Sequence, residues 1–342
     1  MIRVGLIGYG LAGKAFHAPM IDAIPGMELA AVASSRKDEI AADWPRVRVL
    51  ADAAALIADA DIDLVVVAAP NPTHAPLAEA ALNAGKHVVV DKPLALDAAT
   101  GEALAALAVR RRRVLSVFHN RRWDSDFRTV RALVESGTLG DVALYEAHWD
   151  RFRPAIKQGW REVPAEGSGL LADLGPHLID QALQLFGWPE AVEADVTAQR
   201  GEARVDDYFR VTLQYGTMRA VLSAASLVAA ARPRFGVHGT GGSFVKFGLD
   251  PQEATLRAGG RPGDPGYGVE DAAIHGTLTR ADGTIETVVS QAGAYRGFYA
   301  AMAEAIANGA PPPVAPADAV AGLRLIEAAR VSAREGRRIA LV

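Results

Sequence analysis

The sequence predicts an α/β protein of two domains. Its 342 residues exceed what one typical compact core accommodates. Up to about residue 122, short apolar runs alternate with helical segments, which is typical of a doubly wound parallel sheet with helices on both faces. Beyond that point, most strand-like segments alternate apolar and polar residues, as half-buried antiparallel strands do. We therefore expect a parallel α/β domain over residues 1–122 and an α+β domain with a large, mostly antiparallel, open sheet over 123–342.

The first expected strand, residues 2–7, runs directly into a glycine-rich turn, GYGLAG, and then a helical segment to about residue 24. This order of strand, glycine turn and helix is the fingerprint of a Rossmann dinucleotide-binding domain. The first glycine permits the tight turn, the second lets the backbone approach a pyrophosphate, and the third allows close helix packing. We therefore assign cofactor binding to this turn: Gly8, Tyr9, Gly10, Leu11, Ala12 and Gly13.

The residues after the second expected strand, 29–33, indicate which nicotinamide cofactor binds. An acidic residue here would hold the ribose hydroxyls of NAD, but this chain has Ser34, Ser35 and Arg36. A guanidinium and two hydroxyls suit the 2′-phosphate of NADP, which a carboxylate would repel. The sequence thus predicts NADP as cofactor, with NAD as the alternative, while Asp38 and Glu39 come slightly too late for the acidic role.

The remaining elements of the first domain place polar residues at one edge of the sheet. Strands are expected at 47–50, 64–70, 86–93 and 114–120, and helices at 71–85 and 97–109. Ligands of such sheets bind beyond the carboxyl ends of the strands. The residues at or just past these ends are Pro70, Asn71, His74, Asp91, Lys92, His119 and Asn120, and all of them except His119 are assigned to cofactor binding.

The second domain has many expected strands and few crossover helices. Helices are expected at 124–137, 169–187, 298–308 and 317–335, and a Gly- and Pro-rich loop at 250–270. Strands are expected at 141–152, 192–199, 208–215, 218–226 and 235–239, followed by a hairpin around Asp282-Gly283. Such a sheet is covered by helices on one face, and a second copy of the chain is the simplest cover for the other face. We expect a homodimer or homotetramer. The C-terminal helix belongs to this second domain, with packing back on the first domain as the alternative.

The segment GLLADLGPHLIDQALQLFG, residues 169–187, has an unusual polar face. Asp173, His177 and Asp180 recur at helical spacing opposite a leucine-rich face, yet the segment contains no Lys, Arg or Glu, which usually cover a solvated helix face. Pro176 is expected to bend or restart the helix, because it removes a backbone hydrogen bond.

The composition excludes several function classes. The formal net charge is −4, which gives no reason to expect nucleic acid or an anionic membrane as partner. The absence of cysteine excludes disulfides, thiolate nucleophiles and Cys-ligated zinc. Neither a signal peptide nor a long apolar span is evident, so we expect a cytoplasmic protein. No metal site is expected.

Several motifs together resemble the glucose–fructose oxidoreductase, inositol dehydrogenase and MocA (Gfo/Idh/MocA) family of pyridine-nucleotide oxidoreductases. They are GYGLAG, AAPNPTH, GKHVVVDKPLA and the segment 169–187, and the resemblance covers essentially the whole chain. SVFHNRRWDSDF, WDRFRP and GWRE are most similar to the NADP-dependent scyllo-inositol dehydrogenase branch. One departure is Asp91, where most members of the family have Glu before Lys-Pro.

The resemblance implies hydride transfer between the cofactor and a ring hydroxyl or ketone of a cyclitol or sugar. It places Lys92, Asp173 and His177 in the catalytic cleft. His177 would act as general base or acid, Lys92 would stabilise the alkoxide, and Asp173 would orient the imidazole; Lys92 and His177 could exchange roles. It also implies that Asn120, Arg121 and Trp123 lie in the cleft as substrate-binding residues, with Asn120 contacting substrate hydroxyls. Asp180, on the same helix face as His177, is a further substrate-binding candidate; the alternative is that it only bonds to neighbouring backbone.

Two other functions and one other substrate class stay open. A related branch consists of glycoside hydrolases that use bound NAD transiently, although Ser34-Ser35-Arg36 argues against that. A non-catalytic NADP sensor would have no need for Lys92, Asp173 and His177 together. Five arginines leave room for an anionic sugar acid as substrate: Arg121, Arg122, Arg151, Arg153 and Arg161.

Overall fold

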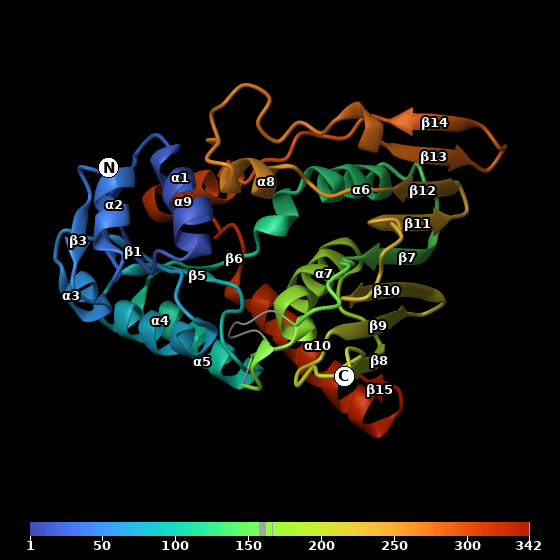
Figure 1. Cartoon of the computed structure of the whole chain (residues 1–342), viewed down its shortest axis with the longest axis horizontal. Helices are drawn as coiled ribbons and strands as arrows, with labels where there is room; N and C mark the ends of the chain where they lie inside the picture. Colours follow the sequence, from blue (N-terminus) through green and yellow to red (C-terminus); the bar gives the residue numbers. More distant parts are fainter. Residues whose placement is uncertain (157–161, 166, 342) are drawn as a thin grey trace. The chain divides into compact units, whose positions relative to one another are not determined.

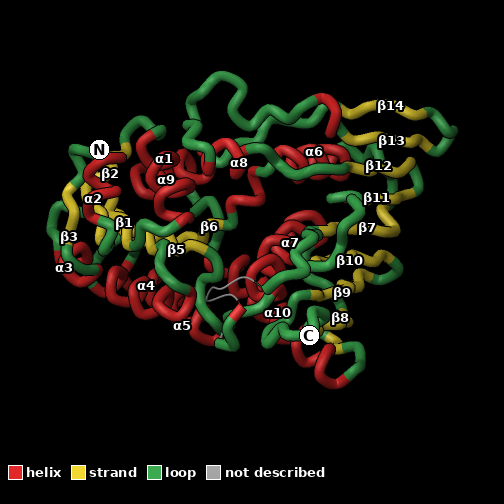
Figure 2. The backbone as a smooth tube through the Cα atoms, in the orientation of Figure 1, coloured by secondary structure: helices red, strands yellow, loops and turns green. Residues whose placement is uncertain are grey.

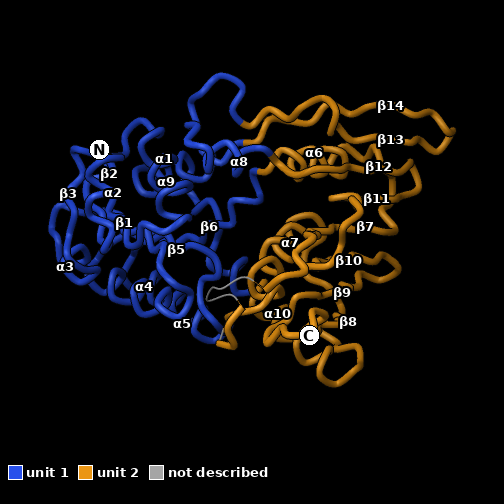
Figure 3. Tube along the Cα trace, viewed as in Figure 1, with its two compact units in different colours: residues 1–123, 251–267, 294–321 blue, residues 124–250, 268–293, 322–342 orange. Residues whose placement is uncertain are grey.

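The computed structural model describes residues 1–156, 162–165 and 167–341. These residues form two compact units (Figure 3). Unit 1 comprises residues 1–123, 251–267 and 294–321, and unit 2 comprises 124–250, 268–293 and 322–342. Each unit therefore draws on segments that are far apart in the sequence.

Unit 1 is built on a six-stranded sheet in the order β3-β2-β1-β4-β5-β6, in which every neighbouring pair is parallel. The strands are β1 (Ile2–Ile7), β2 (Met27–Ala33), β3 (Arg48–Leu50), β4 (Leu64–Val67), β5 (His87–Asp91) and β6 (Leu115–Phe118). The order reverses between β1 and β4, so the carboxyl ends of these two strands form the switch point at which such sheets bind ligands. The predicted doubly wound parallel sheet is confirmed.

Helices cover both faces of this sheet, with α1 and α9 on one face and α4 and α5 on the other (Figure 1). The helical segments are η1 (Ala12–His17), α1 (Ala18–Asp22), α2 (Lys37–Asp43), α3 (Ala53–Ala58), η2 (Asn71–Thr73), α4 (His74–Asn83), α5 (Ala98–Arg111), η3 (Asn120–Trp123), α8 (Gln252–Arg257) and α9 (Arg296–Asn308). Helix α8 interrupts the segment 250–270, for which the sequence predicted only a loop. A six-residue helix between Gly- and Pro-rich flanks is too short to show a helical period.

Unit 2 is built on a nine-stranded sheet in the order β14-β13-β12-β11-β7-β10-β9-β8-β15. The strands are β7 (Val142–His148), β8 (Ala191–Thr197), β9 (Tyr208–Tyr215), β10 (Met218–Ala225), β11 (Phe235–Gly239), β12 (Gly242–Lys246), β13 (Gly276–Arg280), β14 (Ile285–Val288) and β15 (Ile339–Ala340). Only β7 and β10 pair in parallel, and the other neighbours are antiparallel. This confirms the predicted open, mostly antiparallel sheet.

One face of this sheet carries the hydrophobic core. Phe209, Val211 and Leu213 of β9 point into it and are fully buried, whereas Arg210 between them is exposed. Helices α6 (Ser125–Glu135), α7 (Leu170–Phe186) and the second part of α10 (Pro316–Glu335) lie along the core face (Figure 2). Among the described residues, the opposite face of the sheet has no helix along it (Figure 2).

The long helix α7 owes its start to residues far along the chain. Gly169 has φ +94°, and a Cβ there would lie 2.0 Å from Oδ1 of Asp206. The Asp206 carboxylate accepts a hydrogen bond from the Leu171 amide (2.7 Å), and its carbonyl accepts one from the Leu170 amide (2.8 Å). These bonds satisfy donors that a helix N-terminus leaves without partners. The helix then runs through Pro176 to Phe186, so the predicted restart at the proline does not occur.

No helix in the described ranges is both long enough and apolar enough to cross a bilayer.

Candidate functional site

The glycine turn after β1 forms a cradle that fits a dinucleotide pyrophosphate. A Cβ on Gly8 would lie 2.3 Å from the Ala68 carbonyl oxygen, and one on Gly13 would lie 2.2 Å from that of Gly8. Gly10 faces open space, since nothing lies within 4 Å of its virtual Cβ. Two glycines therefore allow the strand, turn and helix to pack, and the third leaves room for a ligand to approach the backbone.

The end of β2 presents the residues predicted to select NADP. The Arg36 amide donates to Oγ of Ser34 at 3.3 Å, and the guanidinium is 55% exposed. The structure adds a partner that the sequence did not indicate: Nη1 of Arg36 lies 3.3 Å from Oε2 of Glu39. Glu39 is thus directed at the arginine, and the chain places no carboxylate at 34–36, where the ribose of NAD would need one.

Tyr9, in the glycine turn, has a hydroxyl that is already engaged by the protein. It donates to Oδ2 of Asp43 at 2.8 Å and accepts a hydrogen bond from Nε1 of Trp44 at 2.8 Å. Burial and the Asp43 carboxylate raise the pKa of Tyr9 above its ordinary value, so the phenol stays protonated at neutral pH.

His74 and Asp91 hold the loops at the carboxyl ends of β4 and β5. The buried His74 ring lies between two backbone carbonyls, with Nδ1 2.7 Å from the Pro93 oxygen and Nε2 2.8 Å from the Ala69 oxygen. Oδ1 of Asp91 accepts the Lys92 amide at 3.0 Å. The shorter acid at position 91 therefore fixes the backbone from which the Lys92 side chain projects.

A fully buried histidine lies behind this turn. Nδ1 of His17 is 2.6 Å from the Tyr299 hydroxyl, and Nε2 is 4.0 Å from Oδ1 of Asp91. The ring also packs against Phe118, with centroids 4.5 Å apart. Burial lowers the pKa of His17 from 6.5 to about 4, although the nearby Asp91 acts in the opposite direction. His17 is therefore neutral when folded at neutral pH.

The pKa of His17 predicts a loss of stability in mild acid. The folded pKa is depressed below the unfolded one, so the unfolded chain binds more protons between pH 6.5 and 4, and stability falls as the pH is lowered. Going from pH 7 to pH 5 should cost about 2 kcal/mol through this residue. Urea unfolding at both pH values should show this component in the unmodified protein and lack it in His17→Gln. An identical pH dependence in both proteins would contradict the assignment.

Helix η3 carries three of the predicted substrate contacts, all in unit 1. Asn120 is buried. The Arg121 guanidinium donates to the Tyr295 hydroxyl (2.6 Å) and pairs with Glu253. The Trp123 ring packs edge-on against Phe298, with centroids 5.7 Å apart. Arg121 and Trp123 thus have protein partners within their own unit.

In unit 2, the polar face of α7 is largely withdrawn from solvent. His177 is 6% exposed and Asp180 is 3% exposed, which explains why this face lacks long charged side chains. Asp173 and His177 lie one helical turn apart, as the sequence predicted. Nη1 of Arg151 lies 4.0 Å from Oδ2 of Asp173. Arg161, another arginine considered for an anionic substrate, lies outside the described residues.

Behind His177, unit 2 contains a stack that no local sequence signal indicated. The Trp149 ring lies 6.0 Å from the His177 ring, and the Arg234 guanidinium carbon lies 4.9 Å from the Trp149 centroid. Nη2 of Arg234 donates to Oε1 of Gln181, one turn beyond His177 on α7, at 3.0 Å. The carboxylate of buried Asp126 is 3.5 Å from Arg234. Burial raises the pKa of Asp126 to about 6. The orientation of the His177 ring is therefore supported by Trp149, which in turn packs against the Arg234 guanidinium.

The structure thus groups the cofactor candidates and Lys92 in unit 1, and Asp173, His177 and Asp180 in unit 2. Across the ranges that the structure describes, no cluster of three or more His, Cys, Asp or Glu side chains has a metal-binding arrangement.

Comparison with known proteins gives matches over nearly the whole chain. Residues 2–119 match the family model "Oxidoreductase family, NAD-binding Rossmann fold", and residues 131–341 match "Oxidoreductase family, C-terminal alpha/beta domain". The Escherichia coli (strain K12) oxidoreductase YdgJ is 47% identical over 345 residues, covering 99% of both chains. The scyllo-inositol 2-dehydrogenase (NADP(+)) IolW of Bacillus subtilis (strain 168) is 41% identical over 343 residues, covering 99% of this chain and 96% of IolW. The solved structure of the Bacillus subtilis protein yvaA has a TM-score of 0.97 at 41% identity, covering 100% of this chain and 98% of that chain.

Proposed function

Because the chain belongs to the Gfo/Idh/MocA oxidoreductase family, we propose that it is an NADP-dependent dehydrogenase acting on a ring hydroxyl or ketone of a cyclitol or sugar. The observation that carries the proposal is the joint presence of an open glycine cradle, an arginine after β2 with no carboxylate at positions 34–36, and a largely buried Asp–His face on α7. The glycine cradle and Arg36 would bind the nicotinamide dinucleotide, and the Asp173–His177 face would serve the oxidation of the alcohol.

The residues that would hold the cofactor lie along the carboxyl ends of β1, β2, β4 and β5. The backbone from Gly8 to Gly13 would bind the pyrophosphate. Ser34, Ser35 and Arg36 would bind the 2′-phosphate, and the loops at 70–71 and 91–92 would line the rest of the site. When bound, the nicotinamide ring supplies the hydride acceptor or donor.

Side chains of the protein would then transfer the hydroxyl proton and stabilise the charge that develops. An imidazole can both accept and return a proton, so His177 is assigned as general base for the hydroxyl proton. The Lys92 ammonium would stabilise the developing alkoxide, and Asp173 would orient the imidazole or bind a neighbouring hydroxyl. Exchange of roles between Lys92 and His177 stays open.

Within the cyclitol and sugar class, scyllo-inositol is the first substrate to test, given the similarity to IolW. One observation favours a second candidate, an anionic sugar acid: Arg151 lies beside Asp173 on the proposed catalytic face. Turnover of a neutral cyclitol and of a sugar acid at equal concentration, followed by NADPH absorbance, distinguishes the two substrate classes: the faster substrate identifies the class.

We expect NADP to bind at least about tenfold more tightly than NAD, a difference of about 1.4 kcal/mol. The Arg36→Ala variant should lose most of this preference, because the 2′-phosphate loses its guanidinium partner. Calorimetric titration with both cofactors measures the ratio directly. Equal affinities in the unmodified protein would contradict the proposed cofactor.

The second domain was expected over 123–342, but residues 251–267 and 294–321 group with unit 1. We further propose that unit 2 serves substrate binding and assembly, and that a second copy covers the helix-free face of its sheet. That face presents polar side chains, among them Arg210, Glu146 and His238, so the interface should be wet and sensitive to salt. Light scattering at micromolar concentration should show a dimer or tetramer in dilute buffer. A 36.0 kDa monomer under those conditions would refute the proposal.

A further inference from the structure

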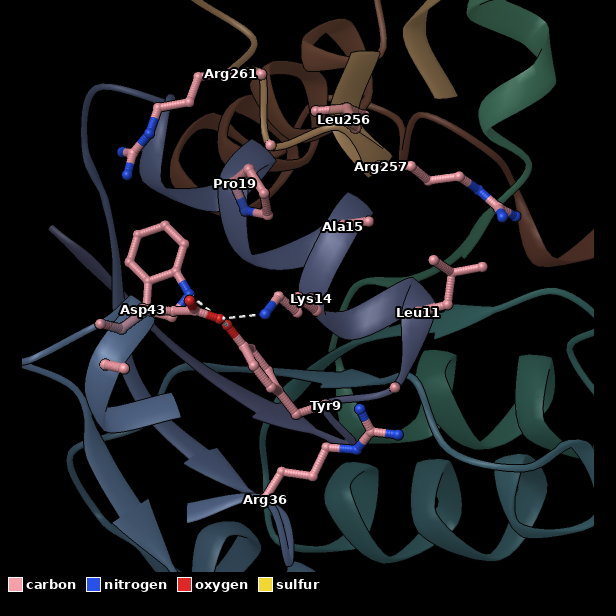
Figure 4. Close-up of a pocket in the computed structure, with 15 residues that line it drawn as sticks. Tyr9, Leu11, Lys14, Ala15, Pro19, Arg36, Asp43, Leu256, Arg257 and Arg261 are labelled. Atoms are coloured by element: carbon pink, nitrogen blue, oxygen red, sulfur yellow. Dashed lines mark hydrogen bonds and ion pairs between the residues drawn. The ribbon is translucent and has the colours of Figure 1, made fainter. Parts of the chain in front are cut away.

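Unit 1 contains a cavity of about 810 Å³ that starts at the glycine turn and extends beyond the nucleotide fingerprint (Figure 4). Its walls come from the helix after the turn, from α2, and from α8 with the loop that follows. Four cationic side chains line it: Lys14, Arg36, Arg257 and Arg261. Asp43 also lines it, and Glu39 pairs with both Lys14 and Arg36. An anionic group that enters the cavity therefore meets several cations but competes with carboxylates of the protein for them.

Two of these cations share one carboxylate. Nζ of Lys14 lies 2.8 Å from Oε1 of Glu39, and Nη1 of Arg36 lies 3.3 Å from Oε2 of the same side chain. The hydrogen bond between Lys14 and Glu39 lowers the pKa of Glu39 and raises the pKa of Lys14, so these two groups are both charged at neutral pH. An anion held by a lysine and an arginine through separate oxygens is the arrangement in which proteins also bind phosphate.

Lys14 is held in this position from its other side. Its Nζ lies 2.9 Å from Oδ2 of Asp43, which accepts the Tyr9 hydroxyl (Figure 4). The Lys14 amide donates to the Gly10 carbonyl at 2.9 Å, which places the residue one turn into the helix that follows the cradle. Lys14 and Arg36 thus reach the same carboxylate from the helix after β1 and from the end of β2, where the adenosine ribose would lie.

We propose that Lys14 is a second cation for the 2′-phosphate of NADP, and that Glu39 is an internal anion which competes with that phosphate for Lys14 and Arg36. The inference rests on the proposed NADP-dependent function and adds its selectivity mechanism. In the absence of a 2′-phosphate, Glu39 neutralises the two cations. With NADP bound, the more highly charged phosphate takes over these contacts.

The test is calorimetric binding of NADP and NAD to the full-length chain and three variants. Lys14→Met should weaken NADP about tenfold and NAD less than about twofold, since only NADP carries the phosphate. Glu39→Gln should tighten NADP by about threefold because the competing charge is gone. Arg3→Met removes an exposed cation of unit 1 that pairs with Glu28 and lies outside the cavity lining, so it should change the NADP/NAD ratio by less than about twofold.

A purely structural role for Lys14 predicts different results. If the Lys14–Glu39 pair only joined two helices, Lys14→Met would weaken both cofactors equally and Glu39→Gln would not tighten NADP; either result overturns the inference. Glu39→Gln keeps the side-chain size and serves if Lys14→Met fails to fold. Equal binding of both cofactors to the unmodified protein would instead contradict the proposed function, and an unchanged ratio in Lys14→Met would still overturn this inference separately.

Discussion

Replacing Lys92 or His177 by alanine should each lower kcat by about 100-fold or more on the best substrate, the size expected when proton-transfer catalysis is lost. His177→Ala removes the proposed base, and Lys92→Ala removes the cation that stabilises the alkoxide. NADP affinity should be nearly unchanged in His177→Ala, because the residue is assigned to the substrate rather than to the nucleotide. Steady-state kinetics and cofactor titration check both statements.

The double variant tests whether the two residues act on the same reaction. If they do, the loss in Lys92→Ala/His177→Ala should be smaller than the product of the two single losses. His275→Ala, at the end of a short helix in unit 2, is the matched control and should keep normal turnover. Near-normal turnover in both single variants would show that the assigned site is wrong.

Gly169→Ala should destabilise unit 2 by roughly 3 kcal/mol and reduce activity, because this glycine sets the start of the proposed catalytic helix. A methyl group there has two costs. The backbone has φ +94°, which L-residues rarely adopt, and the Cβ would collide with the Asp206 carboxylate that caps α7. Thermal or urea unfolding measures the loss.

Gly187, at the other end of α7, is the matched control. It also has a positive φ (+73°), but nothing lies within 4 Å of its virtual Cβ. Gly187→Ala keeps the backbone strain, about 1–2 kcal/mol, but lacks the collision, so it should lose less stability than Gly169→Ala. Equal losses in the two variants would show that the contact with Asp206 has no special role.

The sequence was informative wherever the determinants are local. The turn 8–13 is recognised because its glycines are adjacent, and both sheets were predicted because apolar periodicity is local too. The absence of long charged side chains beside Asp173 and His177 indicated that this face is not an ordinary solvated one, and His177 is buried.

What the sequence could not indicate depends on contacts between distant segments. Asp206 caps α7 through Leu171, 35 residues earlier, and Arg234, just before β11, supports Trp149, just after β7. Glu39 was judged only by its distance from the glycines; its position between Lys14 and Arg36 depends on how two helices pack side by side. The grouping of 251–267 with the first unit likewise has no local signal.

Two other functions are distinguished by simple assays. A glycoside hydrolase that uses its cofactor transiently would release a chromogenic glycoside without added NADP. A cofactor sensor would bind NADP without oxidising any polyol. The proposed dehydrogenase should fail the first assay and turn over substrate.

The most direct test of the proposed function is NADPH formation by the purified protein across a panel of cyclitols, aldoses and sugar acids. We expect NADP-dependent oxidation of at least one ring polyol, with scyllo-inositol as the leading substrate and much weaker turnover with NAD. The reverse reaction should consume NADPH with the corresponding ketone. Absence of turnover across the whole panel, by a protein that binds NADP tightly, would contradict the dehydrogenase assignment.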